Sequence, residues 1–185
     1  MESPRLVVPS SSYKDSYRSL VAEFLARGER LIPFPLSFPN ENFEAFLAQL
    51  AGCEQGIGIP EGFVPHSTFW LLRGEEVVGV SNVRHRLNDR LRVEGGHIGY
   101  GIRPTARGQG LGNAILRLTL AQAARLGIDH VLLTCSKDNV ASSAVIAGNG
   151  GRLESEAFVE ARGEVVQRWL IDIAARAEPA IGDRP

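Results

Sequence analysis

The sequence predicts one α/β (α+β) domain built around a central, mostly antiparallel sheet. Strand-like patterns dominate from residue 68 onward, and the first two flank a short Gly-Glu turn at 74–75 that is typical of a hairpin. A glycine-rich turn at 107–112 precedes a helical pattern, and residues 129–136 are nearly all apolar, as in a strand buried on both faces. With 185 residues, of which 44% are hydrophobic, the chain can build one sizeable core.

The amino-terminal third is predicted to be mainly helical. We expect a short strand at 5–9, and then a helix that is capped by the serines at 10–12 and ended by Gly28. Three prolines in the segment 31–39 exclude a helix interior and a central strand, so we expect an ordered loop that shapes specificity. Asn40 is expected to cap a second helix.

The remainder of the chain is predicted to alternate between strands and helices. Strand patterns occupy residues 68–73, 76–83, 96–103, 129–136, 153–159 and 165–173. Helical patterns occupy residues 110–126 and 140–147. We therefore expect a single domain over residues 1–173, followed by a disordered carboxy-terminal tail at 174–185.

The composition excludes several classes of protein. Twenty Lys and Arg residues against 21 Asp and Glu residues give a net charge of -1, which provides no field to recruit nucleic acid or an anionic membrane. Cys53 and Cys135 lack the spacing of a disulfide framework or a zinc site, so no metal is expected. Without an export signal or an apolar run of membrane-spanning length, the sequence is expected to be cytoplasmic.

The turn at residues 107–112, which reads RGQGLG, is the strongest candidate for a binding site. Such a turn exposes the first N–H groups of the following helix, and the helix dipole and Arg107 both favour an anionic phosphate. A plain connecting turn is the alternative. A nucleoside-triphosphate loop would need a lysine and a hydroxyl residue where Asn113 and Ala114 stand. A dinucleotide fold would need GxGxxG and an acidic residue at the end of the next strand, which ends in residues 134–136 (TCS).

The same turn resembles the acetyl-CoA signature of the GNAT family, Arg/Gln-x-x-Gly-x-Gly/Ala, with Arg107, Gly110 and Gly112 at the defining positions. Residues 96–104 resemble the fourth strand of that family, and the segment that begins at Asp138 resembles its second CoA-contacting region. The resemblance covers roughly residues 68–173 and implies a GNAT fold of about seven strands and about four helices, splayed between the fourth and fifth strands.

The resemblance also implies acetyl-CoA as the cosubstrate. The amides of the turn would hold the diphosphate, and the backbone around Ile102 would pair with the pantetheine. Asn139 would bond the pantetheine arm, although it could also be a helix N-cap, and Ser142 is either a contact or ordinary helix surface. The predicted cofactor-binding residues are Gly101, Ile102, Arg103, Arg107, Gly108, Gln109, Gly110, Leu111, Gly112, Asn113, Asn139 and Ser142.

Acetylation of an amine requires a neutral attacking nitrogen and stabilisation of the developing oxyanion. Many family members carry a glutamate in the fourth strand that deprotonates the amine, and His97 occupies that position here. A histidine suits the role chemically, but it could equally be a structural residue hydrogen-bonded to a neighbour. Glu94 is a competing base, and the backbone at 101–103 is the expected oxyanion donor.

The sequence departs from the family at the residue that protonates the leaving thiolate. The family tyrosine falls on Ile146, so that role is open. Tyr100 or one of the serines at 142–143 could substitute for it, or the thiolate could leave without assistance.

A charged segment after the third strand is the candidate acceptor site. Arg84 or Arg86 could bind a carboxylate if the substrate is amino-acid-like, and His85 and Asn88 could orient the acceptor. A solvated, charged loop explains the same residues. We expect the substrate to be a primary amine of a small molecule that attacks directly in a ternary complex. The alternatives are a CoA-sensing or partner-binding module without turnover and a protein or peptide N-acetyltransferase. The final strand pair could support a homodimer.

Overall fold

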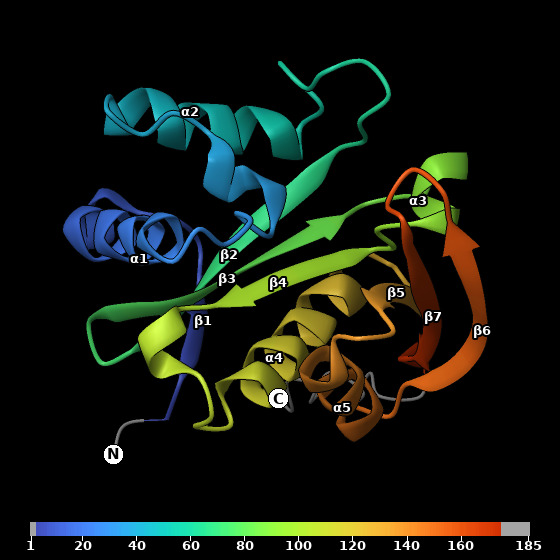
Figure 1. The fold of residues 1–185 in the computed structure, drawn as a ribbon. Coiled ribbons are helices and arrows are strands. Elements are labelled where there is room, and N and C mark those ends of the chain that lie inside the picture. The colour runs from blue at the N-terminus through green and yellow to red at the C-terminus, as the bar shows by residue number, and fades with distance from the viewer. Residues whose placement is uncertain (1–2, 175–185) are drawn as a thin grey trace, which may run out of the picture.

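The computed structural model describes residues 3–174 and shows two antiparallel sheets with helices packed around them (Figure 1). The predicted tail lies outside the described residues except for Ala174. The first sheet has the order β1-β2-β3-β4, with β1 at Arg5–Val7, β2 at His66–Arg73, β3 at Glu76–Arg84 and β4 at Ile98–Ile102. The second sheet has the order β5-β7-β6, with β5 at His130–Ser136, β6 at Arg152–Val159 and β7 at Glu164–Asp172. These strands confirm the predicted α/β class and the strand count.

The helices follow the predicted pattern with two differences. They are α1 (Lys14–Ala26), α2 (Phe43–Glu54), α3 (Asp89–Val93), α4 (Leu111–Arg125) and α5 (Val140–Gly148). The prediction of Asn40 as the cap of α2 is wrong, because Asn42 Oδ1 accepts the hydrogen bond from Ala45 N–H at 3.1 Å. Helix α3 was not predicted, since a helix this short carries no apolar period. No helix in the described part of the chain has the length and apolar character needed to cross a membrane.

The helices cover both faces of the first sheet. Helices α1 and α2 pack on one face, where the ring of Tyr17 stacks on the fully buried Trp70 with centroids 4.6 Å apart. Such a pair adds about 0.5–1.5 kcal/mol beyond the area that it buries. Helix α4 packs on the opposite face and buries Ile115 and Leu116 completely. This packing fixes the start of α4, and hence the glycine turn, at the end of β4.

The two sheets meet where β4 begins. His97 donates its N–H to Leu132 O at 2.7 Å, and Leu132 N–H donates to Nδ1 of the His97 side chain at 3.0 Å. Gly96, with φ at 60°, makes this approach possible, because a Cβ there would overlap the backbone of Leu132. No ladder links β4 to β5 in residues 3–174, so the two strands part after this joint, as expected for a splayed sheet.

Removal of the His97 side chain from this joint should destabilise the fold. His97→Ala removes the acceptor of the Leu132 N–H, and we expect the free energy of unfolding to fall by about 1–3 kcal/mol in urea titrations. The matched control is His130→Ala on β5, because the His130 side chain is exposed and should change stability by less than about 0.5 kcal/mol. Equal effects of the two substitutions would contradict the role of His97 in the joint.

Candidate active site

A cavity of about 600 Å³ lies between β4, the glycine turn and α5. A fourth wall comes from α1 and the segment that follows it, through Phe24, Glu29, Arg30 and Ile32. All the predicted cofactor-binding residues line this cavity except Arg103 and Gln109. The parting of the sheets therefore creates a space of ligand size at the predicted place.

The glycine turn presents unpaired donors to this cavity. Gly108 and Gly110 have φ angles of 75° and 77°, which side chains rarely adopt, and Gly110 is the N-cap of α4. The first hydrogen bond of the helix runs from Ala114 N–H to Gly110 O. Within the described residues, the N–H groups of Gly110, Leu111, Gly112 and Asn113 have no acceptor. Together with the dipole of a 15-residue helix, they form a site for an anion.

The close packing of α5 against α4, rather than the backbone conformation of the turn, requires a glycine at position 112. A Cβ on Gly112 would lie 2.9 Å from Cγ2 of Val145 in α5, closer than side chains tolerate. The glycine thus lets α5 approach the start of α4. Asn139 caps α5 by accepting from Ser142 N–H at 3.0 Å, and both residues line the cavity. The N-cap expected as an alternative for Asn139 is therefore present in the structure.

Arg107 is held in place by a carboxylate that the sequence did not indicate. Its guanidinium forms two hydrogen bonds to Glu29, at 2.9 and 2.6 Å, and its Nε donates to Ile102 O at 3.1 Å. The group also lies over the ring of Phe24, 5.4 Å from the centroid. The hydrogen bonds from Arg107 lower the pKa of Glu29. Part of the positive charge expected at the turn is thus neutralised by Glu29, and the backbone donors carry more of the anion binding.

Arg103 and Gln109 face away from the cavity. Arg103 forms ion pairs with Glu23 at 2.6 Å and Glu76 at 2.9 Å, which tie the end of β4 to α1 and β3. Gln109 instead bonds Arg73 and Thr105 O. Neither side chain lines the cavity, so any contact of these two residues with the cofactor would involve the backbone.

Of the backbone donors predicted at residues 101–103, only the N–H of Ile102 is directed away from β3, and the N–H of Tyr100 joins it. Arg103 N–H donates to Val78 O at 2.9 Å, so it is not free to bind an oxyanion. The antiparallel register pairs Val80 with Gly101, and alternation directs the N–H of Gly101 toward β3 as well. The same alternation directs the N–H groups of Tyr100 and Ile102 away from β3, toward the opening between the sheets.

Tyr100 places a phenol in this opening. Its hydroxyl lies 3.1 Å from Ser142 Oγ, and both residues line the cavity. Burial raises the pKa of Tyr100 to about 12, so the hydroxyl carries its proton at neutral pH. Ile146 is 1% exposed and lies in the core, which leaves Tyr100 as the phenol that reaches the cavity.

His97 and Glu94 lie outside the cavity lining. Nδ1 of His97 accepts the hydrogen bond from Leu132, so the neutral ring carries its proton on Nε2. Burial, followed by the charges of Arg84 and Arg92, lowers the pKa of His97 to about 4. This geometry matches the structural alternative for His97 rather than a general base. Glu94 ends α3 and has its backbone N–H bonded to Arg90 O.

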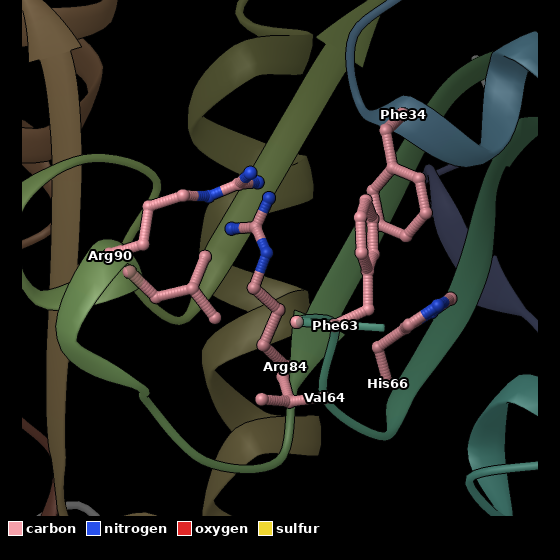
Figure 2. A pocket seen from close by; sticks show the side chains of 8 residues that line it. Phe34, Phe63, Val64, His66, Arg84 and Arg90 are labelled. Atoms are coloured by element: carbon pink, nitrogen blue, oxygen red, sulfur yellow. The ribbon is translucent and has the colours of Figure 1, made fainter. Parts of the chain in front are cut away.

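A second pocket, of about 100 Å³, lies beside β4 on the side of α3 (Figure 2). Of the predicted acceptor residues, Arg84 lines it, whereas His85 and Asn88 do not. His85 Nε2 contacts Ser67 Oγ at 2.9 Å, and Asn88 caps α3 and donates to Gly62 O. His66 and Arg90 line the pocket and were not predicted, since their sequence neighbourhoods carry no motif.

A protein-family model described as an acetyltransferase (GNAT) domain matches residues 15–152. A comparison with curated proteins gives no match. Among solved structures, the chain is similar to RimL, a ribosomal L7/L12 α-N-protein acetyltransferase in complex with coenzyme A, with a TM-score of 0.68, 20% identity and coverage of 95% of this chain and 97% of that chain.

Two further solved structures have similar folds. The microcin C7 self-immunity acetyltransferase MccE, in complex with acetyl-CoA and AMP, has a TM-score of 0.67 and 16% identity, with coverage of 94% of each chain. Mycobacterium smegmatis RimJ, in complex with CoA-disulfide, has a TM-score of 0.67 and 17% identity, with coverage of 95% of this chain and 84% of that chain. At these identities the likeness concerns the fold.

Proposed function

The chain belongs to the GNAT acetyltransferase family, and from this membership we propose that it transfers the acetyl group of acetyl-CoA to the primary amine of a small molecule. The observation that carries the proposal is the row of unpaired N–H groups from Gly110 to Asn113, at the mouth of a cavity of about 600 Å³. A diphosphate supplies the acceptors that these donors lack. The enzyme contributes binding, orientation and proton transfer, and acetyl-CoA supplies the activated acetyl group.

The open edge of β4 fits the pantetheine arm. The peptide groups of Tyr100 and Ile102 face the opening, and they can pair with an amide-bearing chain as a neighbouring strand would. One of these N–H groups then serves as the donor that stabilises negative charge on the carbonyl oxygen under attack. The acceptor nitrogen forms the new bond to the carbonyl carbon, the bond from carbon to sulfur breaks, and the nitrogen releases one proton to water while the sulfur gains one.

Tyr100 is the residue that we propose for protonation of the leaving sulfur. It is protonated at neutral pH, and Ser142 holds its hydroxyl inside the cavity. In this role Tyr100 would take the place of the family tyrosine, whose position in this sequence is occupied by Ile146. Ser142 can in turn pass a proton to the phenolate, because a hydroxyl both donates and accepts.

The chain segment that covers the site favours a small molecule over a protein as the acceptor. The segment from Ile32 to Phe34 lies across β4, where a Cβ at Gly101 would overlap the Ile32 carbonyl and one at Gly99 would lie 3.4 Å from Pro33 Cβ. An open groove for a polypeptide would lack this cover. The similarity in fold to RimL, an α-N-protein acetyltransferase, is the observation that keeps a protein N-terminus as the second candidate acceptor.

The first test concerns the anion site. Gly110→Asp places a carboxylate beside the donors, and we expect the affinity for CoA, measured by calorimetry, to fall at least about tenfold through charge repulsion. Gly110→Ala is the matched control, because it has the same unfavourable φ and the space around Gly110 is open to a Cβ. Equal affinities of the two variants would contradict the assignment of the diphosphate.

The second test concerns the proton donor. Tyr100→Phe should lower kcat about a hundredfold, with an unchanged Kd for CoA, since it removes only the hydroxyl. The kcat is measured from steady-state CoA release with a panel of amines. Tyr13→Phe, near the amino terminus and outside the cavity, is the matched control. A wild-type protein that binds CoA but releases none with any amine would instead favour a CoA-sensing module.

The third test concerns the base. The cavity lining includes no imidazole, and its carboxylate, Glu29, is paired with Arg107, so we expect the amine to enter uncharged. Because a protonated amine is not nucleophilic, kcat/KM should rise with pH by about one log unit per pH unit up to the pKa of the amine. Two acceptors of different pKa should give two different break points. A common break point for both would indicate a base on the enzyme.

A further inference from the structure

We propose that the pocket beside β4 binds a carboxylate, so that the acceptor is a small amine that also carries a carboxyl group. This inference rests on the proposed function, because it names the class of acceptor. Figure 2 shows the guanidinium groups of Arg84 and Arg90 on one side of the pocket and the rings of Phe34, Phe63 and His66 on the other. The pocket thus combines cationic donors with an apolar wall.

The two arginines lack an anionic partner within residues 3–174. Arg84 Nη1 donates to the carbonyl oxygens of Gly95 and Gly96, at 2.8 and 3.0 Å, and no carboxylate lies within ion-pair distance of Arg84 or Arg90 in this part of the chain. Burial, followed by the charge of Arg90, lowers the pKa of Arg84 to about 10, so the group is still charged at neutral pH. Two neighbouring cations without a counter-ion favour a bound anion.

His66 supplies an unpaired donor to the same pocket. Its side chain is buried, and Asn82 Nδ2 lies 2.9 Å from its Nδ1. The same amide nitrogen donates to Ser67 O, which fixes the orientation of the amide and makes Nδ1 the acceptor. The ring proton therefore resides on Nε2, which is buried with no partner in the described structure. A carboxylate oxygen in the pocket would satisfy it, as buried polar groups require.

The size of the pocket limits what it can hold. A volume of about 100 Å³ corresponds to the share of roughly three water molecules, enough for a carboxylate and one or two carbons. Phe34 and Phe63, with ring centroids 5.1 Å apart, close the apolar side, and the Arg90 guanidinium lies over Phe63 at 5.6 Å. These contacts favour a short aliphatic amino acid over a long or polyanionic acceptor.

The pocket and the large cavity are bordered by the same short segment of chain. Ile32 lines the large cavity and Phe34 lines the pocket, so the same short segment borders both. Arg84 Nη2 would lie 3.7 Å from a Cβ at Gly99, the residue next to Tyr100 on β4. A carboxylate bound by Arg84 would therefore lie near β4, and the proposal requires that the amine of the same molecule reaches the transfer site at Tyr100.

The experiment compares pairs of acceptor amines that carry either a carboxylate or the neutral carboxamide at the far end. Glycine, 3-aminopropanoate and 4-aminobutanoate are each paired with the corresponding amide, and CoA release is measured per concentration of neutral amine. We expect at least one carboxylate to exceed its amide about tenfold in kcat/KM. Arg90→Gln and His66→Phe should each reduce that ratio about fivefold or more. Arg92→Gln, an exposed change on the same helix that does not line the pocket, should leave the ratio unchanged.

Calorimetric titration of the CoA-bound protein with the same pairs separates the two proposals. If no amine is acetylated, the proposed function fails, and carboxylate-selective binding that Arg90→Gln abolishes would still support the pocket. If each carboxylate and its amide react equally well, or if neither Arg90→Gln nor His66→Phe changes the ratio, the pocket assignment is overturned while the acetyltransferase proposal stands.

Discussion

Two hydrogen bonds between His97 and Leu132 join the sheets at the start of β4, and the geometry of the site depends on them. Held at this point and unpaired beyond it, β4 and β5 must diverge, and the divergence leaves the peptide groups of Tyr100 and Ile102 without a strand partner. A continuous sheet would pair these groups and fill the cavity. Gly96 is part of the same constraint, because any side chain there would force the strands apart.

Features that depend on neighbouring residues could be predicted from the sequence. The glycine turn, the helix after it and the cap at Asn139 are local, so periodicity, glycine placement and N-cap chemistry indicate them correctly. The resemblance to the GNAT family then supplied the arrangement of these elements. The sequence could not show why a glycine is needed at position 112, because the need comes from Val145, which approaches from another helix.

Features that depend on distant residues could not be predicted. Glu29 lies 78 positions before Arg107, and neither residue carries a signal for the other. The ion pairs of the Arg103 side chain with Glu23 and Glu76 likewise join residues far apart in the sequence, and no local pattern indicates them. His97 occupies the position of the family base, yet only the structure shows that Leu132 uses its Nδ1.

The glycine turn and the pocket beside β4 differ in how their arginine side chains are compensated. At the glycine turn Glu29 forms an ion pair with Arg107, so under the proposed function the diphosphate would be bound chiefly by the backbone N–H groups. At the pocket beside β4, the described residues compensate the charge of Arg84 only with the carbonyl dipoles of Gly95 and Gly96. Burying a cation in this way costs free energy that a bound carboxylate would recover. If the proposed pocket binds the acceptor, relief of this cost would favour a carboxylate selectively, because a neutral group of the same size cannot compensate the charge of Arg84.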